Sequence, residues 1–426
     1  MIGLLAATLV ALRAGTLIDG TGGAPLRDAV VLVEDGRIKA VGAGLPVPPA
    51  AELIDLGGRT LLPGFVDAHV HLAYRTFGDG DWQHANLVMP SAERALLGAA
   101  HAQQTLEGGF TTVRVLGTAR FEDVALRNAI DAGWLPGPRI LAAGVSFGAF
   151  GGHCDATGGL AVDAVPEGGV ERGVADGVEG VREAVRYVIK HGADVVKICA
   201  TGGVLSPDDL GAQQYTEDEM RAAVETARML GRQVAAHAHG TEGIKAAVRA
   251  GVASIEHGWL LDAEGAALMK QRGTWLVPTL SAIELGERLE KAGQLPRQIA
   301  EKVRFVAHRA RESCRLAVSA AVPLALGTDA GVITHGTNGH EFSLLAACGL
   351  SPMQAIVAGT LGGATLLGRE KDVGSITAGK AADLVAVAGD PLQDLGLLEH
   401  ADFVMKDGRV VVRDGRVLGR SAKGVP

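Results

Sequence analysis

The central part of the chain alternates short apolar runs with segments of helical spacing, and this alternation constrains the fold more than any other feature. Strands that alternate with helices are typical of parallel sheets in α/β proteins. Eight such units predict a (β/α)8 TIM barrel, whose working residues lie at the carboxyl ends of the strands. The eight expected strands are residues 62–68, 111–116, 139–145, 194–199, 233–236, 253–256, 274–278 and 323–327.

The segment after Thr216 shows the helical pattern most clearly. Thr216 and Glu219 have the spacing of a capping box, in which each residue satisfies a free backbone N–H of the other. Apolar residues from Met220 to Leu230 recur at helical spacing. Gly231 follows, and glycine is the favoured residue just beyond a helix. The pattern predicts a helix between Thr216 and Gly231.

The two ends of the chain resemble each other and differ from the middle. Near the N-terminus, two strand-like runs flank the Asp-Gly pair at 35–36, which is a strong hairpin signal. Near the C-terminus, similar runs flank the Asp-Gly pairs at 407–408 and 414–415. We therefore expect one small β-sandwich domain built from both termini. The predicted domains are the sandwich, 1–60 and 369–426, and the barrel, 61–368.

The composition excludes several classes of partner. The 426 residues carry a net charge of −8 and no basic run, so we expect no nucleic-acid partner. No apolar segment reaches the length of a membrane-spanning helix, so we expect no membrane partner. Residues 1–12 lack the basic start and the cleavage site of a signal peptide, and residues 9–18 are predicted as a strand. A cytoplasmic location follows. A periplasmic or secreted location is the alternative, if residues 1–7 are the remnant of a leader.

The four cysteines, Cys154, Cys199, Cys314 and Cys348, stand far apart in the sequence. No pair has the two-residue spacing of a zinc-binding or redox motif. We therefore expect neither a disulfide framework nor a cysteine zinc site, and interpret all four as buried free thiols. Cys199, two residues after Lys197, is expected to be a small side chain packed in the barrel.

Side chains able to bind metal ions stand at the ends of the predicted strands. His69 and His71 end the first strand, and residues i and i+2 of a strand point to the same side. Their imidazoles can therefore share one metal ion. Any one such residue is equally compatible with a capping role, but polar groups at five strand ends indicate a joint metal site. The other four strand ends carry Lys197, His237, His257 and Asp329.

These motifs resemble the amidohydrolase superfamily. Within it they are most similar to the imidazolonepropionase-like branch, which contains Xaa-Pro dipeptidases and ochratoxin-degrading amidohydrolases. The resemblance covers nearly the whole chain. It rests on the histidines of residues 61–72, on Lys197 followed by Thr-Gly-Gly-Val at 201–204, and on residues 374–384, a segment typical of the superfamily's β-sandwich.

The resemblance implies a binuclear centre of two divalent metal ions, expected to be Zn²⁺. N6-carboxylated Lys197 and a hydroxide would bridge the two ions. A free ammonium has no lone pair for a metal, so carboxylation would make this lysine a ligand. The alternative for Lys197 is a snorkelling or salt-bridged lysine. The implied ligands are His69, His71 and Asp329 for the first ion, His237 and His257 for the second, and Lys197 for both.

The resemblance also implies an activity, namely hydrolysis of the amide bond of N-acyl amino acids or of dipeptides with a free carboxylate. Ochratoxin A, a phenylalanine amide, fits this description and would release phenylalanine. Asp329 would be the catalytic residue that takes a proton from the nucleophile and delivers it to the leaving amine. Relatives further imply a homo-oligomer, octamers included, that acts on a small molecule.

Three further histidines are predicted to bind the substrate. His153 follows a Gly-rich segment after the third strand, and His239 shares the strand-end face of His237. Both are candidate partners for a substrate carboxylate, with a surface position as the alternative for His153. The choice of His237 over His239 as metal ligand comes from the resemblance. The three candidates are His153, His239 and His335.

Two other functions stay open. A ring-opening hydrolase of the imidazolonepropionase type, or a lactonase, would typically use one metal ion and no carboxylated lysine. Lys197 and the glycines at 202–203 argue against it. A catalytically dead scaffold would have lost ligands, and here every expected ligand is present. A serine nucleophile has no support because the sequence contains no GxSxG motif.

Overall fold

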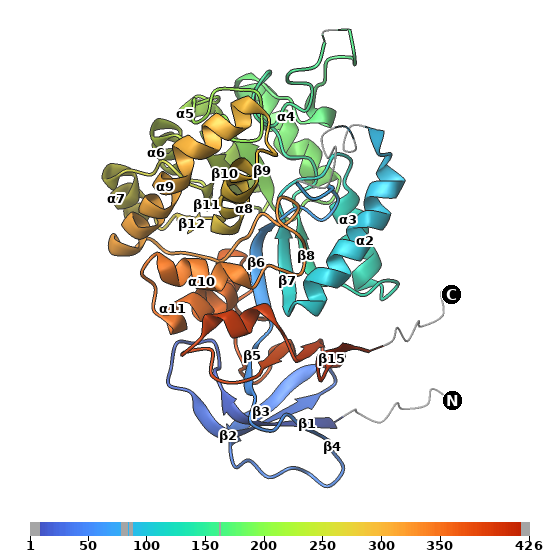
Figure 1. Ribbon diagram of the computed structural model, residues 1–426. Coiled ribbons are helices and arrows are strands. Elements are labelled where there is room, and N and C mark those ends of the chain that lie inside the picture. The colour runs from blue at the N-terminus through green and yellow to red at the C-terminus, as the bar shows by residue number, and fades with distance from the viewer. Residues whose placement is uncertain (1–8, 78–83, 85–87, 162, 419–426) are drawn as a thin grey trace, which may run out of the picture.

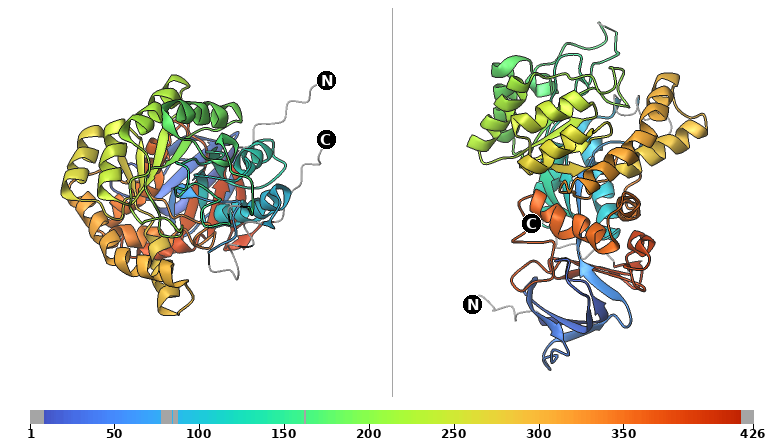
Figure 2. Two further views of the ribbon diagram at one scale, coloured as in Figure 1. Left: turned by 90° about the horizontal axis from the view of Figure 1, so that it is seen from above. Right: turned by 90° about the vertical axis from the view of Figure 1, so that its left-hand side faces the viewer.

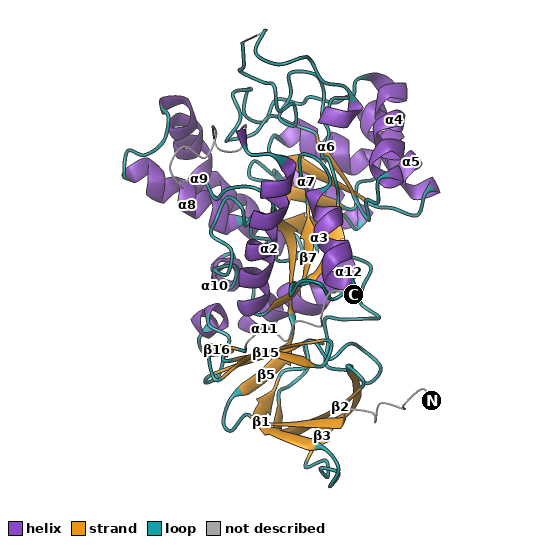
Figure 3. Cartoon of the chain, turned by 90° about the vertical axis from the view of Figure 1, so that its right-hand side faces the viewer, coloured by secondary structure: helices purple, strands orange, loops and turns teal. Residues whose placement is uncertain are grey.

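The computed structural model describes residues 9–77, 84, 88–161 and 163–418. It is a mixed α/β fold with two parts along its long axis. A body of helices around strands makes up one part, and a layer of strands lies at its end (Figures 1 and 3). The candidate leader at residues 1–7 lies outside the described residues. Among the described helices, none is both long enough and apolar enough to cross a membrane.

Strands from both ends of the chain form one nine-stranded sheet, blue and red in Figure 1. Its order is β16-β15-β14-β13-β5-β1-β2-β3, and β4 pairs with β1. The strands are β1 (Leu9–Leu17), β2 (Leu26–Glu34), β3 (Arg37–Ala43), β4 (Glu52–Asp55), β5 (Thr60–Pro63), β13 (Leu384–Val387), β14 (Phe403–Lys406), β15 (Arg409–Arg413) and β16 (Arg416–Val417).

The predicted N-terminal hairpin is confirmed. Glu34 of β2 pairs with Arg37 of β3. Between them, Asp35 and Gly36 have φ angles of 50° and 78°, the positive values that a two-residue type I′ turn requires.

The two ends of the chain also share one apolar core. Leu12 and Val31 pack in the same buried cluster as Leu384 and Phe403. Because apolar burial drives the association of strands, this cluster explains why segments so distant in sequence form one sheet. The domain ranges themselves stay a prediction.

The middle of the chain forms two parallel sheets, with orders β6-β7-β8 and β12-β11-β10-β9. Their strands are β6 (Phe65–Val70), β7 (Phe110–Val115), β8 (Arg139–Ala142), β9 (Val196–Cys199), β10 (Val234–Ala238), β11 (Ser254–His257) and β12 (Trp275–Val277). Single parallel bridges continue the pairing between the sheets. They join Phe147 to Ile198, Leu276 to Leu324, and Val70 to Ala330.

Helices surround these strands when the molecule is seen from above, and the pair α8 and α9 projects from the body (Figure 2). The predicted helix after Thr216 is confirmed as α5, with both hydrogen bonds of the capping box. The α-helices are α2 (Ser91–Glu107), α3 (Glu122–Asp131), α4 (Gly177–Lys190), α5 (Glu217–Met229), α6 (Thr241–Ala250), α7 (Ala263–Arg272), α8 (Leu280–Lys291), α9 (Arg297–Ser319), α10 (His340–Ala347), α11 (Pro352–Val357) and α12 (Gly363–Leu366). Shorter turns are η1 (Val170–Arg172), η2 (Ala358–Gly362) and η3 (Leu395–Glu399).

Two of the eight expected strands differ from the prediction in kind, and the third, expected at residues 139–145, already ends at Ala142. The first is divided at Gly64, where β5 joins the terminal sheet and β6 begins the parallel one. A Cβ on Gly64 would lie 2.1 Å from Thr111 Oγ1, so only glycine allows this crossing. The eighth segment, residues 323–327, forms no regular strand, and only Leu324 makes a bridge.

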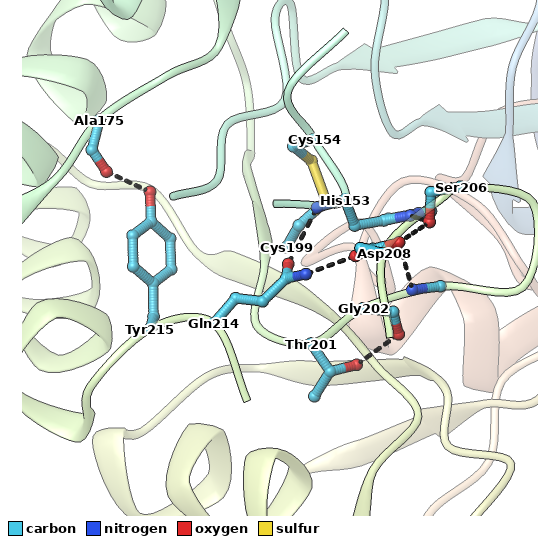
Figure 4. Close-up of a disulfide and its surroundings, with 11 residues drawn as sticks. His153, Cys154, Ala175, Cys199, Thr201, Gly202, Ser206, Asp208, Gln214 and Tyr215 are labelled. Carbon is cyan, nitrogen blue, oxygen red and sulfur yellow. Dashed lines mark hydrogen bonds between the residues drawn. A yellow bond between two sulfur atoms is a disulfide. The ribbon is translucent and has the colours of Figure 1, made fainter. Parts of the chain in front are cut away.

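The prediction of four free thiols is wrong. Disulfides join Cys154 to Cys199 and Cys314 to Cys348, with Cα–Cα distances of 5.8 Å and 5.7 Å. The loop after β8 returns to the end of β9 and brings Cys154 against Cys199 (Figure 4). The paired residues are 45 and 34 positions apart in the chain. Such spacings carry no pairing signal, because the fold alone brings the residues together.

Candidate metal centre

The first predicted ligand pair lies at the end of β6, and Asp329 lies beside it. The Nε2 atoms of His69 and His71 are 3.5 Å and 3.2 Å from Oδ1 of Asp329. Asp329 takes this position because its φ is 60° and its N–H donates to the carbonyl of His69 at 2.8 Å. The three side chains offer two imidazole nitrogens and a carboxylate oxygen within 4.8 Å of one another. This set suits one metal ion of the zinc type.

Lys197, His237 and His257 come from the neighbouring strands β9, β10 and β11. All three are buried, with exposed fractions of 4%, 4% and 6%. The ring centroids of His237 and His257 are 4.7 Å apart, and His257 lies 4.9 Å from the ring of His69. The structure thus brings the six predicted ligands to the wall of a single cavity.

Two observations indicate that these residues fit metal ions. Nε2 of His237 is buried and has no hydrogen-bond partner among the described residues. Such a state is costly for a ring nitrogen, and a metal ion would relieve it. Lys197 is buried too, and no carboxylate of the described chain lies within 4 Å of its ammonium. The salt-bridged alternative for Lys197 therefore has no support.

The electrostatics of the site favour uncharged imidazoles. Burial and the Lys197 ammonium lower the pKa of His69 to about 4, and burial lowers the pKa of His239 to about 3. Burial likewise lowers the pKa of Lys197 to about 8. Burial alone would raise the pKa of Asp329, but His69 and other neighbours hold it below its usual value. At neutral pH the imidazoles of His69 and His239 are therefore uncharged, and Asp329 is an anion.

Three of the ligand imidazoles make a further hydrogen bond through Nδ1, which the sequence analysis missed. One partner is a carboxylate, one a hydroxyl and one a backbone carbonyl. Such contacts orient metal-binding histidines and fix which nitrogen faces the metal. The pairs are His69 with Glu256 Oε2 at 2.8 Å, His257 with Thr279 Oγ1 at 2.7 Å, and His71 with the carbonyl of Gly117 at 3.3 Å.

Arg114 and Glu256 form a buried ion pair behind His69. Arg114 Nη2 lies 2.8 Å from Glu256 Oε1, and the side chains are 2% and 0% exposed. Burial would raise the pKa of Glu256, but Arg114 and the hydrogen bond from His69 hold it at about 2. The sequence does carry a signal for this pair. Each is a charged residue inside an apolar strand, and such residues are almost never buried without a partner.

Asp67 connects β6 to the segment that carries Asp329. Its carboxylate accepts from the His69 N–H at 3.0 Å, from the Thr328 hydroxyl at 2.6 Å and from the Asn338 amide at 2.7 Å. These hydrogen bonds lower the pKa of Asp67, but burial outweighs them and raises it to about 6. The network fixes the backbone on both sides of the first ligand cluster.

His153 lies against the second pair of ligands and lines the cavity, so the surface alternative for it fails. Its ring stacks on His237, with 4.0 Å between centroids. Its Nδ1 lies 2.7 Å from the hydroxyl of Ser206 (Figure 4). The adjacent Cys154–Cys199 disulfide fixes this loop to β9, the strand that carries Lys197.

The other two candidate substrate histidines lie in different surroundings. His239 lines the cavity, with its ring 5.0 Å from His257 and 4.5 Å from Trp259. His335 is buried and stacks on His101 at 4.3 Å. It is not among the described residues that line the cavity. The structure therefore gives no support to substrate contact by His335.

The cavity has a volume of about 800 Å³. The ligand cluster forms its polar end. Its other walls are largely apolar, with Val204 and Leu205 after β9, Ile283 of α8, and Ile299 and Val303 of α9. This size and this mixture of apolar walls with a few convergent polar groups are typical of a small-molecule site.

The chain is similar to known proteins over most of its length. Residues 60–418 match the Amidohydrolase family model. Ochratoxinase from Aspergillus niger is 31% identical over 418 residues, which cover 93% of this chain and 85% of that protein. A crystal structure of a Xaa-Pro dipeptidase with bound methionine in the active site is 39% identical, with a TM-score of 0.91 over 95% of this chain and 99% of that chain.

A second solved structure is a prolidase complexed with N-methylphosphonate-L-proline. It is 33% identical, with a TM-score of 0.87, and the match covers 95% of this chain and 100% of that chain. The family model covers well over half of the chain, and the relatives cover 93–95% of it. The chain therefore belongs to the amidohydrolase family and is a hydrolase that acts on C–N bonds.

Proposed function

We propose that the chain is a binuclear metal-dependent hydrolase, which cleaves the amide bond of N-acyl amino acids or of dipeptides with a free carboxylate. We also infer that β6 to β12, with residues 323–330, form a (β/α)8 barrel, because strand ends of such a barrel converge on one face. The observation that carries the proposal is the convergence at one end of a single cavity of His69, His71, Lys197, His237, His257 and Asp329.

In this proposal, each ion has its own imidazole pair. His69 and His71, with Asp329, would hold the first ion, and His237 and His257 the second. Nitrogen and oxygen ligands of this kind suit zinc, although they also bind other divalent metals.

Lys197 would become a ligand by carboxylation. Its neutral amine would add to CO₂, so that an N–C bond forms while one C=O π bond opens, and the nitrogen would release a proton to water to give an anionic carbamate. The reaction needs the free amine, and the burial that lowers the pKa of Lys197 to about 8 increases its fraction at neutral pH. In this form Lys197 would supply anionic oxygen ligands to the two ions.

Asp329 would move the proton. When bound, the two ions acidify a water molecule and polarise the scissile carbonyl. The Asp329 carboxylate is an anion at the ligand cluster, 3.2 Å from His71 Nε2. It can accept a proton from that water and deliver it to the leaving nitrogen, as general acid–base catalysis requires.

The lining of the cavity supports the proposed substrate class. His153 and His239 lie beside the ligand cluster and are the proposed partners of a substrate carboxylate. The apolar walls suit a bulky side chain or acyl group. The names of the relatives, ochratoxinase, Xaa-Pro dipeptidase and prolidase, support an amide substrate with a free carboxylate. Ochratoxin A joins both features in one molecule.

Amino-acid release by the zinc-loaded protein tests this proposal. The substrates are N-acyl-phenylalanines, Xaa-Pro dipeptides and ochratoxin A, each paired with its carboxamide, which lacks the carboxylate. We expect amino-acid release from at least one free acid and much slower release of the amino-acid amide from its carboxamide. Release from none of them would reject the substrate class. Equal rates for acid and carboxamide would reject the carboxylate requirement.

Two further expectations accompany the proposal. A homo-oligomer, up to an octamer, stays a prediction that light scattering would test.

The two disulfides bear on the cellular location, since disulfides persist mainly in oxidising compartments. They favour the periplasmic or secreted alternative over the cytoplasmic one.

A further inference from the structure

We propose that Glu256 and Arg114 are positioning residues for the first metal position, formed by His69, His71 and Asp329. Glu256 keeps the proton of His69 on Nδ1, so that Nε2 presents its lone pair to the metal. Arg114 in turn fixes Glu256. This inference rests on the proposed function, because it concerns the orientation of a ligand toward a metal ion at that site.

The hydrogen bond between His69 and Glu256 can have only one direction. An ionised carboxylate accepts and cannot donate. Nδ1 of His69, 2.8 Å from Glu256 Oε2, must therefore carry the proton. The neutral ring then has its lone pair on Nε2, the atom that lies 3.5 Å from Oδ1 of Asp329. The His69 and Glu256 side chains are only 1% and 0% exposed, so water does not compete for this bond.

Two donors hold the other oxygen of Glu256. Oε1 accepts from Nη2 of Arg114 at 2.8 Å and from the hydroxyl of Ser254. The guanidinium is permanently charged, and it compensates the buried carboxylate. Nε of Arg114 also donates to the carbonyl of Ala68 at 2.6 Å. The Arg114 side chain, on β7, thus links β6, which carries His69, to β11, which carries Glu256.

Two other imidazole ligands, His257 and His71, have neutral partners. Nδ1 of His257 faces the Thr279 hydroxyl at 2.7 Å, and Nδ1 of His71 faces the Gly117 carbonyl at 3.3 Å. A hydroxyl can donate or accept, so Thr279 does not impose one tautomer. A carboxylate imposes the tautomer and also raises the basicity of the ligand. Among these three, only His69 has this stronger support.

The substitution Glu256→Gln keeps the size of the side chain but inverts one hydrogen bond. Arg114 can only donate, so it would hold the amide oxygen, and the amide N–H would then face Nδ1 of His69. His69 would respond by carrying its proton on Nε2, which removes the lone pair from the metal side. Thr279→Val is the matched control, because it removes the hydrogen-bond partner of His257, a ligand at the second metal position.

Two measurements on the full-length metal-free protein test the proposal. Long-range ¹H–¹⁵N imidazole spectra report the tautomer of His69. Titration with Co²⁺, followed by absorption and by metal count, reports affinity. In E256Q we expect the His69 proton on Nε2, and one of two Co²⁺ equivalents bound about 10–100-fold more weakly. In T279V we expect the His69 tautomer of the unsubstituted protein.

An E256Q protein with unchanged tautomer and unchanged Co²⁺ affinity would overturn the inference, while two bound equivalents in the parent protein would leave the proposed function standing. A parent protein that binds no Co²⁺ would instead contradict the proposed function. If E256Q does not fold, Arg114→Lys and Ser254→Ala loosen Glu256 without replacing it. Both should weaken Co²⁺ binding, and unchanged affinity in both would equally overturn the inference.

Discussion

Asp329 and His71 contact each other across the site, with Oδ1 of the aspartate 3.2 Å from Nε2 of the histidine. The contact joins the end of β6 to the segment that follows residue 327. The positive φ of 60° at Asp329 turns its side chain toward the cavity, where it is one of the lining residues. A carboxylate held there can serve both as metal ligand and as proton carrier.

Asp329→Asn is therefore expected to keep the metal ions and lose most turnover. The amide oxygen can still act as a ligand, but the amide cannot accept the proton. Loss of a general acid–base group corresponds to about 10²–10⁴-fold in kcat. Metal content and kcat are measured on the same preparation. Full activity with full metal content would remove Asp329 from the proton-transfer step.

Lys197→Ala is expected to lower kcat/KM by about 10³-fold or more, because several kcal/mol of charge stabilisation depend on the bridged ions. Short carboxylates such as acetate should restore part of the activity by occupying the space of the carbamate. Lys245→Ala is the control, since Lys245 pairs with Glu242 and Glu264 and does not line the cavity. Undiminished activity of Lys197→Ala would exclude a carbamate bridge.

The two disulfides provide a matched pair of variants. Cys154→Ser and Cys314→Ser should each lower the free energy of unfolding by roughly 2–4 kcal/mol. Cys154→Ser should also lower kcat/KM, because Cys154 and Cys199 line the cavity and fix the loop of His153. Cys314 lies in α9 outside the cavity lining. Equal kcat/KM in both variants would show that the first disulfide does not support the site.

Local patterns made much of the fold and of the site predictable. The turn at 35–36 and the helix after Thr216 depend on neighbouring residues alone, and both are confirmed. His69 and His71 share one side because they are two residues apart in β6. Once strands alternate with helices, side chains at successive strand ends meet in space. For this reason the residues at the ends of the predicted strands were enough to predict that the ligands form one cluster.

Contacts between distant segments could not be predicted in this way. Glu256 was interpreted only as part of a strand, and nothing local indicates that its carboxylate bonds His69. The disulfide of Cys154 was missed because it depends on the course of the loop after β8. Likewise, a histidine at 335 looks the same in sequence whether it faces the cavity or stacks on His101. Packing in three dimensions decides each case.

His340 provides a pH-dependent test of the fold away from the site. Its Nδ1 and Nε2 lie 3.0 Å from carboxylates of Glu399 and Glu284. Burial opposes the charge, but these two hydrogen bonds raise the pKa of His340 above its ordinary value. The charged form is therefore favoured in the folded state. Its stabilisation is present in full below pH 6.5 and is lost as pH rises through the raised pKa.

His340→Asn should thus destabilise the protein at pH 5.5 by about 0.5–1 kcal/mol, the range of partly exposed ion pairs. The difference from the unsubstituted protein should shrink by pH 9. Urea unfolding at the two pH values measures both quantities. His308→Asn, at an exposed position beside Glu312, is the control and should change stability by less than about 0.5 kcal/mol at either pH. A His340→Asn effect that does not depend on pH would contradict a stabilising charge on His340 between Glu284 and Glu399.

The most direct test of the central claim is a zinc titration of the metal-free protein, in which release of phenylalanine from an N-acyl-phenylalanine or from ochratoxin A is measured at each step. If five side chains and the carbamate of Lys197 hold two ions, activity should rise until two equivalents per chain are bound and then stay constant. A plateau at one equivalent would favour the ring-opening alternative with a single ion. Absence of release at every zinc concentration would contradict the account of the site as an amide-hydrolysing binuclear centre.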